Sequence, residues 1–232
     1  ALSTLVGVDP ARVSFIPNGI DVDRVRARSR AQCGAIDAPF ILGVGRLSQQ
    51  KDFETLIRAY ALTRRSAPTL GLTIVGQGPR RRLRSLRKLA RALGVERNVR
   101  FEGYRDNPAA YMARAAVFVS SSRWEGSSNV VLEALACGAP VVATAAPTGV
   151  REVLAPSSLA PLTPVGNAEA LADAILWRLN APRDAAQLVA RARSYPLSAT
   201  LDAYVARLKT EVALASGEKA NSYNPVSFAR RA

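Results

Sequence analysis

The sequence predicts an α/β fold in which a doubly wound, Rossmann-like parallel sheet of about six strands carries helices on its faces. Short β-branched or apolar runs alternate with longer segments whose apolar residues recur at helical spacing. Glycine-bearing turns follow three of the apolar runs, at the carboxyl ends of strands where such sheets bind ligands. At 232 residues the chain is long enough for one large domain of this kind.

Six apolar runs are the expected strands. Each is short and rich in β-branched or apolar residues, as strands of a buried parallel sheet are. They are VSFI from Val13, FILGV from Phe40, LTIV from Leu72, VRF from Val99, AVFVS from Ala116 and PVVAT from Pro140.

Segments with helical spacing fill the intervals between these runs. Four lie between strands, and three more follow the last strand after the proline-rich stretch APSSLAPLTP. We expect one domain over residues 1–215, and the polar, aperiodic tail 216–232 predicts poor order. The expected helices cover residues 52–67, 79–93, 108–114, 129–137, 168–180, 185–193 and 199–215.

Composition narrows the classes of function. The chain has no histidine, which excludes a His-based triad, and Cys33 and Cys137 lie too far apart for a zinc-ligand pattern. Both cysteines are expected in or near the core. Asp21 and Asp23 have D-x-D spacing but belong to the turn after PNGI, so no metal site is expected. No secretory signal or membrane-length apolar run is apparent, and a cytoplasmic location is expected.

The charge predicts an anionic partner. The 32 Lys and Arg residues exceed the 18 Asp and Glu residues, giving a net charge of +14. Basic residues are densest between residues 80 and 100, where they alternate with an apolar stripe at helical spacing. This basic amphipathic helix has either a solvated outer face, or a face for an anionic membrane or another polyanion. Without interleaved aromatic residues, nucleic acid is not an expected partner.

The turn GVGRLSQQK after the run at Phe40 has the features of a phosphate site. Glycine lets the backbone approach a phosphate, and cations complete the shell around it. Arg46 and Lys51 lie across this turn at a spacing that allows both side chains to converge on one diphosphate. From this spacing alone, a chance occurrence of the two cations is as good an explanation as a diphosphate site.

The segment WEGSSNVVLEALACG contains two acids with different surroundings. Glu125 lies at a strand end, where a carboxylate accepts hydrogen bonds from sugar hydroxyls, and Glu133 lies about one turn inside the next helix. A buried Glu133 needs a partner such as the diol of a ribose. Amides at the helix start favour an anion or sugar oxygens. The competing interpretation is that Ser128 or Asn129 only caps the helix and Glu133 faces water.

Five ordered blocks together resemble a known family. The sequence is similar to the C-terminal, donor-binding domain of retaining family-four glycosyltransferases with the GT-B fold, over roughly residues 13–180. The blocks are IPNGID from Ile16, GRLSQQKDFETLI from Gly45, IVGQGP from Ile74, VRFEGY from Val99, and the E-x7-E segment that continues into ALACGAPVVAT.

The resemblance implies catalytic contacts for three residues. Arg46 and Lys51 resemble the pair that neutralises the nucleotide diphosphate, and Glu125 resembles the acid that contacts the donor hexose. Fixed cations at a leaving diphosphate stabilise the transition state more than the ground state. The family's reaction retains anomeric configuration, and Glu125 is not assigned as a nucleophile.

Further positions are implied to bind the nucleotide sugar. Glu133 resembles the acid that binds the ribose, the turn at Gly103 and Tyr104 is similar to the one that meets the base, and residues 147–149 match a small-residue loop near the donor. The remaining binding positions are Gly45, Gly126, Ser127, Ser128, Asn129 and Val130. The implied donor is a UDP-sugar or GDP-sugar, used without a cofactor or metal.

The implied reaction moves a hexose to a glycan or lipid-linked acceptor, in the cytoplasm or at the inner membrane face. Two departures from the family pattern matter. The resemblance begins at the domain junction, so residues 1–12 are expected as its remnant, and the chain is expected to be inactive without an N-terminal acceptor domain. SSLAPLTPVG replaces a more glycine-rich connection. The main alternative is a non-catalytic nucleotide-sugar-binding module, which has less need of the hexose-facing Glu125.

Overall fold

The computed structural model describes residues 7, 13, 15–34, 39–147, 149–155 and 160–216. The chain divides into two compact units, Ile20–Ser194 and a smaller unit that combines Ala1–Gly19 with Tyr195–Ala232. The larger unit ends at Ser194, whereas the sequence pattern placed residues 1–215 in a single domain. Apart from Gly7 and Ser216, the expected junction segment 1–12 and the expected tail lie outside the described residues.

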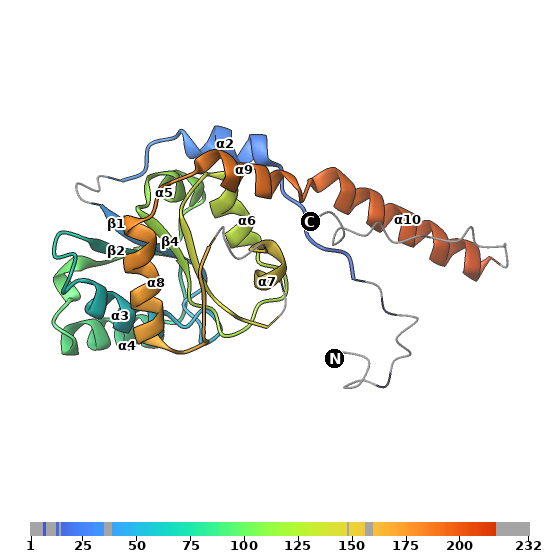
Figure 1. Ribbon diagram of the computed structural model, residues 1–232. Helices are drawn as coiled ribbons and strands as arrows, with labels where there is room; N and C mark the ends of the chain where they lie inside the picture. The colour runs from blue at the N-terminus through green and yellow to red at the C-terminus, as the bar shows by residue number, and fades with distance from the viewer. Residues whose placement is uncertain are drawn as a thin grey trace. The chain divides into compact units, whose positions relative to one another are not determined.

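A parallel six-stranded sheet forms the centre of the larger unit (Figure 1). Its strand order is β3-β2-β1-β4-β5-β6, which is the Rossmann order, and the predicted fold class is confirmed. This order places the topological switch point between β1 and β4, where such sheets bind ligands. The strands are β1 (Phe40–Val44), β2 (Gly71–Val75), β3 (Val99–Gly103), β4 (Val117–Ser120), β5 (Val141–Thr144) and β6 (Leu162–Thr163).

The sheet's sixth strand is not the one expected. The run from Val13 is wrong as a strand, because Val13 and Phe15 are outside any strand and are 46% and 65% exposed; Ser14 lies outside the described residues. The strand β6 instead falls in the proline-rich connection, where Thr163 pairs with Thr144 of β5. A two-residue strand is too short to have a recognisable period, which is why the sequence did not indicate it.

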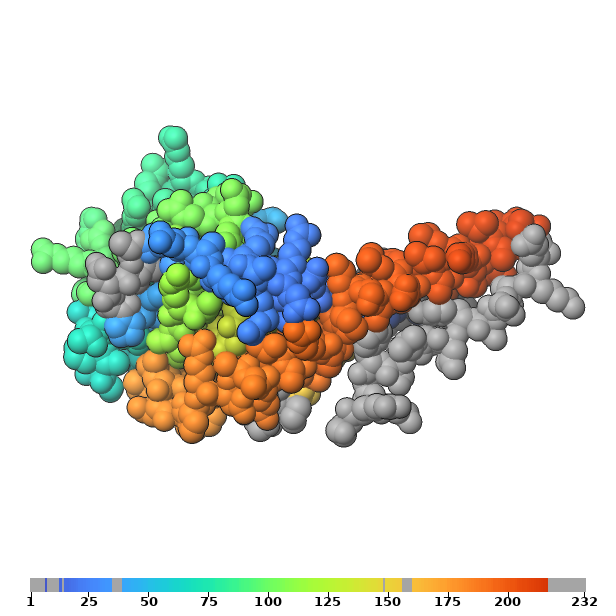
Figure 2. All heavy atoms as spheres, turned by 90° about the horizontal axis from the view of Figure 1, so that it is seen from above, coloured from blue at the N-terminus to red at the C-terminus, as the bar shows by residue number. Residues whose placement is uncertain are grey.

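Two layers of helices cover the sheet (Figure 1). The helices α3, α4 and α8 pack together in one layer, and α2, α5, α6 and α9 pack together in the other. Figure 2 shows α2 beside α9, although they are far apart in sequence. The helices are α2 (Val22–Ser29), α3 (Phe53–Thr63), α4 (Arg80–Ala92), α5 (Ala109–Arg114), α6 (Asn129–Ala136), α7 (Val150–Val153), α8 (Ala168–Asn180) and α9 (Ala185–Arg193), with a 3₁₀ turn at Glu96–Asn98.

Side-chain caps explain why the bounds of α8 and α9 match expectation. Asn167 accepts a hydrogen bond from the Ala170 amide at 2.8 Å, and Asp184 caps α9 in the same way. The helix α2 was not expected, because Val22 is its one buried residue and it has no apolar stripe for the sequence to reveal. Both acids of the D-x-D pair have structural contacts: Asp21 caps α2, and Asp23 lies 2.6 Å from Arg193 of α9.

The smaller unit contains α10 (Leu197–Ala215), which begins two residues before the expected helix. The Thr200 hydroxyl donates a hydrogen bond to the Pro17 carbonyl at 2.9 Å, which ties the start of α10 to the segment before Gly19. Within the described ranges, no helix combines the length and the apolar character needed to cross a bilayer.

Candidate active site

The switch point of the sheet brings two loops into contact. We call residues 45–52, after β1, the cation loop and residues 121–128, after β4, the acid loop. The Arg123 amide donates to the Gln50 carbonyl at 2.8 Å, and the Gln50 side chain donates to the Trp124 carbonyl at 3.0 Å. Each loop therefore fixes the backbone of the other at the carboxyl edge of the sheet.

A short ion pair joins the two loops. Lys51 Nζ lies 2.6 Å from Glu125 Oε1, and the two side chains are only 18% and 6% exposed. The Ser122 hydroxyl donates to the same carboxylate oxygen, and the Ser121 hydroxyl donates to the Lys51 carbonyl at 2.8 Å. An ammonium has three N–H donors. Lys51 can thus contact Glu125 and an anion together.

Asp52 stabilises the end of the cation loop. It has a left-handed backbone with φ of 44°, the one such non-glycine conformation among the described residues. This conformation costs about 1–2 kcal/mol. Its buried carboxylate offsets the cost by accepting hydrogen bonds from the Thr55 hydroxyl at 2.8 Å and from Arg123 Nε at 2.9 Å. Together with the Thr55 amide contact at 3.3 Å, these bonds cap α3 directly after Lys51.

Sequence reasoning missed these supporting residues. Asp52 was assigned to a helix, and Ser121, Ser122 and Arg123 were not singled out. An acid at the start of an apolar helical pattern is a recognisable capping signal. Ser121 is 70 positions from its partner Lys51, and Arg123 is 71 positions from its partner Asp52. A local sequence pattern does not indicate contacts over such separations.

The glycine and tyrosine positions lie at the carboxyl ends of β1 and β3, on either side of β2. The Gly45 amide donates to the Val75 carbonyl at 2.9 Å, and the Gly103 carbonyl accepts from the Gly76 amide at 2.7 Å. A Cβ on Gly45 would lie 2.9 Å from Lys51 Cε, so glycine leaves room for the lysine side chain. Tyr104 is 62% exposed and its ring is available to a ligand, although no observed contact tests that role.

The start of α6 is closely packed against the small-residue loop. A Cβ on Gly149 would lie 3.0 Å from the Gly126 carbonyl oxygen and 3.3 Å from the Ser128 amide. Ser128 is buried and its side chain does not cap α6. Within the described part of the chain its hydroxyl has no hydrogen-bond partner. Ser127 accepts a backbone bond from Asn129 at 2.9 Å, Val130 follows in the first turn, and Thr148 lies outside the described residues.

Glu133 faces the interior more than solvent. Burial raises the pKa of its carboxyl, and the charge of Arg28 on α2 acts in the opposite direction. Burial raises the pKa of the nearby Cys137 thiol to about 12, and the charge of Glu133 contributes to this rise. Among the described residues the Glu133 carboxylate makes no hydrogen bond. A half-buried acid with unused acceptors suits a ligand that carries hydroxyl donors.

Arg46 lies in a neighbouring cavity of about 740 Å³. Arg123 and Arg82, which line the same cavity, are paired with Asp52 and Glu54 at 2.9 Å and 2.5 Å. Lys51, Glu125 and Glu133 are not among its lining residues. The structure therefore brings Lys51 and Glu125 together, while the grip of one diphosphate by Arg46 and Lys51 stays a prediction. The lining is Arg46, Leu47, Ser48, Gln49, Asp52, Glu54, Pro79, Arg81, Arg82, Ser85 and Arg123.

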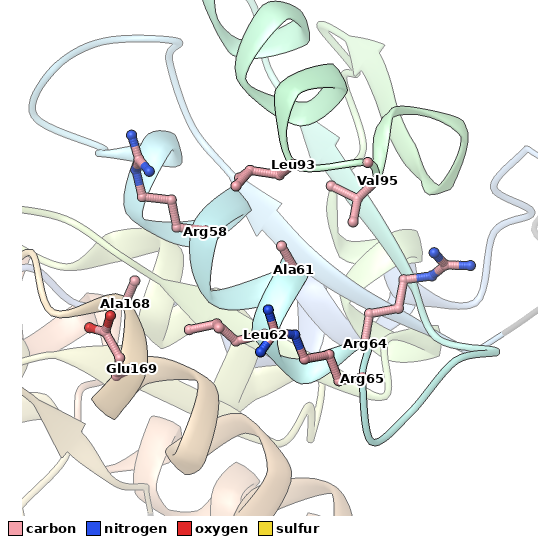
Figure 3. Close-up of a pocket in the computed structure, with 10 residues that line it drawn as sticks. Arg58, Ala61, Leu62, Arg64, Arg65, Leu93, Val95, Ala168 and Glu169 are labelled. Carbon is pink, nitrogen blue, oxygen red and sulfur yellow. The ribbon is translucent and has the colours of Figure 1, made fainter.

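A second cavity, of about 470 Å³, lies between α3, α8 and the segment after α4 (Figure 3). It contains three arginines. Figure 3 shows the Arg58 and Arg64 side chains diverging to different sides of Ala61, while Arg65 lies beside Leu62. Guanidinium groups that diverge do not form a site for one anion. This cavity has none of the residues that the sequence singled out.

Comparisons with known proteins show the family to which the chain belongs. Residues 38–181 match the family model described as "Glycosyl transferases group 1". The chain is 35% identical over 160 residues to the N-acetylgalactosamine-N,N'-diacetylbacillosaminyl-diphospho-undecaprenol 4-alpha-N-acetylgalactosaminyltransferase of Campylobacter jejuni, covering 69% of this chain and 42% of that protein. It is 39% identical over 150 residues to the GDP-mannose-dependent alpha-(1-6)-phosphatidylinositol monomannoside mannosyltransferase of Mycolicibacterium smegmatis, covering 57% and 38%. The chain thus spans less than half the length of these two curated relatives.

Solved structures show the same fold. The Anabaena protein Alr3699/HepE, in complex with UDP and glucose, superposes with a TM-score of 0.77 at 24% identity, over 89% of this chain and 59% of that one. Sucrose-phosphate synthase of Thermosynechococcus elongatus gives 0.71 at 29% identity, over 87% and 53%. The chain belongs to the group 1 glycosyl transferases and corresponds to the C-terminal domain of a GT-B enzyme.

Proposed function

We propose that this chain is the donor-binding half of a retaining glycosyltransferase that moves a hexose from a UDP-sugar or GDP-sugar to a glycan or lipid-linked acceptor. The observation that carries the proposal is the Lys51–Glu125 contact at the switch point of the sheet. This contact puts an ammonium beside a carboxylate. The proposal assigns the ammonium to the diphosphate and the carboxylate to the sugar, on either side of the bond that breaks.

The proposed chemistry assigns a separate task to each end of the donor. When the bond between the sugar and the phosphate breaks, positive charge develops on the sugar and negative charge on the diphosphate. Lys51 and Arg46 stabilise the leaving diphosphate. The acceptor oxygen forms the new bond to the anomeric carbon, and the leaving phosphate oxygen takes the proton of that acceptor hydroxyl. Glu125 holds hexose hydroxyls, and Glu133 holds the ribose diol. No step requires a metal or a cofactor.

Names of the relatives support the class of donor and acceptor. The mycobacterial relative is named as GDP-mannose-dependent, and the Anabaena structure contains UDP and glucose. The names of two relatives include undecaprenol and phosphatidylinositol. We infer that a separate acceptor-binding region completes the enzyme, and that the reaction takes place on the cytoplasmic side of a membrane, close to its surface.

Substitution of Glu133 by glutamine tests the donor site. Calorimetric titration with UDP-, GDP- and ADP-sugars should show that the wild-type chain prefers one of them. In Glu133→Gln the affinity should fall about tenfold or more, because a charged hydrogen bond contributes about 1.5–3 kcal/mol. Equal affinity in both proteins would contradict the assignment of Glu133. Binding without transfer, even when an acceptor domain is supplied, would indicate a non-catalytic module.

The same variant should have the opposite effect on stability. Because burial raises the pKa of Glu133 above 4.5, its contribution to folding stability is full below about pH 4.5 and is lost as the pH rises through the raised pKa. Without ligand, Glu133→Gln should therefore be more stable than wild type at neutral pH, and urea titrations should show the difference shrinking on acidification. Glu169→Gln, an exposed substitution on α8, is the matched control and should show no such trend.

A further inference from the structure

Six exposed cations lie on one side of α4. At 100° per residue they occupy an arc of about 120°, and the buried Leu86 and Ala90 lie on the opposite side of the helix. No acidic residue occurs in the helix. We call this surface the α4 basic face. It consists of Arg80, Arg81, Arg84, Arg87, Lys88 and Arg91.

Few internal contacts neutralise the α4 basic face. Arg91 pairs with Glu96 at 2.8 Å, and this arginine is 75% exposed. Arg87 lies 5.8 Å from the centre of the Phe101 ring. In the described ranges of the chain the other four cations form no ion pair. The face therefore keeps a strong positive charge in the folded protein.

These charges oppose helix formation. Three arginines fill the first turn of α4, at the positive end of the helix dipole, and Pro79 at the N-cap position provides no side-chain cap. The cations also repel each other at spacings of four residues, as Arg80 and Arg84 do. Packing of Leu86 and Ala90 keeps the helix folded. A helix whose charges disfavour its own formation is typical of a functional surface. An anionic partner would remove the repulsion between the cations.

We propose that the α4 basic face binds the surface of an anionic phospholipid bilayer. The face has no exposed apolar or aromatic side chain, so it is suited to adhere through charge rather than to insert or to stack on bases. The helix begins just after β2, at the carboxyl edge of the sheet that also carries the cation loop. The inference rests on the proposed function, since a membrane-bound enzyme of this class meets a lipid-linked acceptor there.

Vesicle flotation tests the surface. The chain should bind phosphatidylcholine vesicles that contain about one third phosphatidylglycerol and should not bind pure phosphatidylcholine. Arg84→Gln/Lys88→Gln should weaken partitioning about 30-fold, because each cation near an anionic leaflet contributes roughly a fivefold factor. Raising the salt from about 0.1 M to about 1 M, which shortens the Debye length from about 10 Å to about 3 Å, should abolish binding.

A matched pair on another helix separates this face from the general basicity of the chain. Arg24→Gln/Arg30→Gln, on and after α2, removes two exposed charges and should leave partitioning nearly unchanged. The proposal would be overturned if both double variants lost vesicle partitioning equally, or if the wild-type chain bound neutral vesicles. Tighter binding to single-stranded RNA than to anionic vesicles, lost in the α4 pair, would assign the face to nucleic acid instead. Unfolding midpoints check that both pairs fold, and donor titration of the α4 pair tests the donor site independently.

Discussion

Substitution of Gly76 by alanine should destabilise the larger unit by about 2–5 kcal/mol in urea unfolding. Gly76 follows β2 with φ of 143°, and a Cβ at this position would lie 1.9 Å from the Gly45 carbonyl oxygen. Neither backbone can move freely, because the Gly76 amide is bonded to Gly103 and the Gly45 amide to Val75. The expected loss is a large part of the 5–15 kcal/mol that stabilises an ordinary domain.

Gly94→Ala is the matched control for this prediction. Gly94 also has a positive φ, of 72°, but a Cβ there would meet no atom within 4 Å. Gly94→Ala should therefore lower the free energy of unfolding only by the cost of a left-handed backbone at a non-glycine residue, about 1–2 kcal/mol. Equal unfolding free energies for Gly76→Ala and Gly94→Ala would contradict the prediction. They would show that the close contact between the ends of β1 and β2 does not constrain the cation loop.

Substitution of Lys51 by methionine should weaken nucleotide-sugar binding about 10- to 150-fold. Methionine keeps the unbranched side chain up to the ε position, but the donor diphosphate loses a charged hydrogen bond of about 1.5–3 kcal/mol. The free protein should also lose stability by a similar amount, because Glu125 is 6% exposed and loses its 2.6 Å contact with the ammonium. Calorimetric titration and urea unfolding of the same preparation measure both effects.

The double variant Lys51→Met/Glu125→Gln separates these two roles of the lysine. With neither charge present, the folded protein should recover most of its stability, because a buried pair replaced by neutral groups leaves no unpaired charge. Affinity for the nucleotide alone, without a sugar, should stay low. Recovery of nucleotide affinity would show that Lys51 serves to neutralise Glu125 and does not bind phosphate.

Parts of the fold that depend on local patterns were predictable from the sequence. The strands β1, β2, β4 and β5 are buried apolar runs, and α8 and α9 begin at capping residues, so composition and spacing reveal both. The strand β3 was also expected, although only Val99 in it is buried. The sequence did not reveal α2, whose stability comes from packing against other helices, nor the short β6. The run at Val13 has the composition of a strand but lies in the smaller unit and outside the sheet.

The candidate site was predictable to a different degree. The motifs indicated Lys51 and Glu125, and the structure brings these two side chains into contact. Contacts between the two loops depend on the switch point in the strand order, which no local signal encodes. Asp52 is the clearest example, because its left-handed backbone is stabilised by Arg123 from the other loop. The placement of Arg46 in a separate arginine-lined cavity likewise required the structure.

A crystal structure of the chain with a bound nucleotide sugar tests the central claim most directly. We expect the diphosphate to contact Lys51 and Arg46, the ribose hydroxyls to contact Glu133, and the hexose to contact Glu125. A nucleotide bound elsewhere, for instance in the cavity lined by Arg58 and Arg64, with none of these four side chains in hydrogen-bond range, would contradict it.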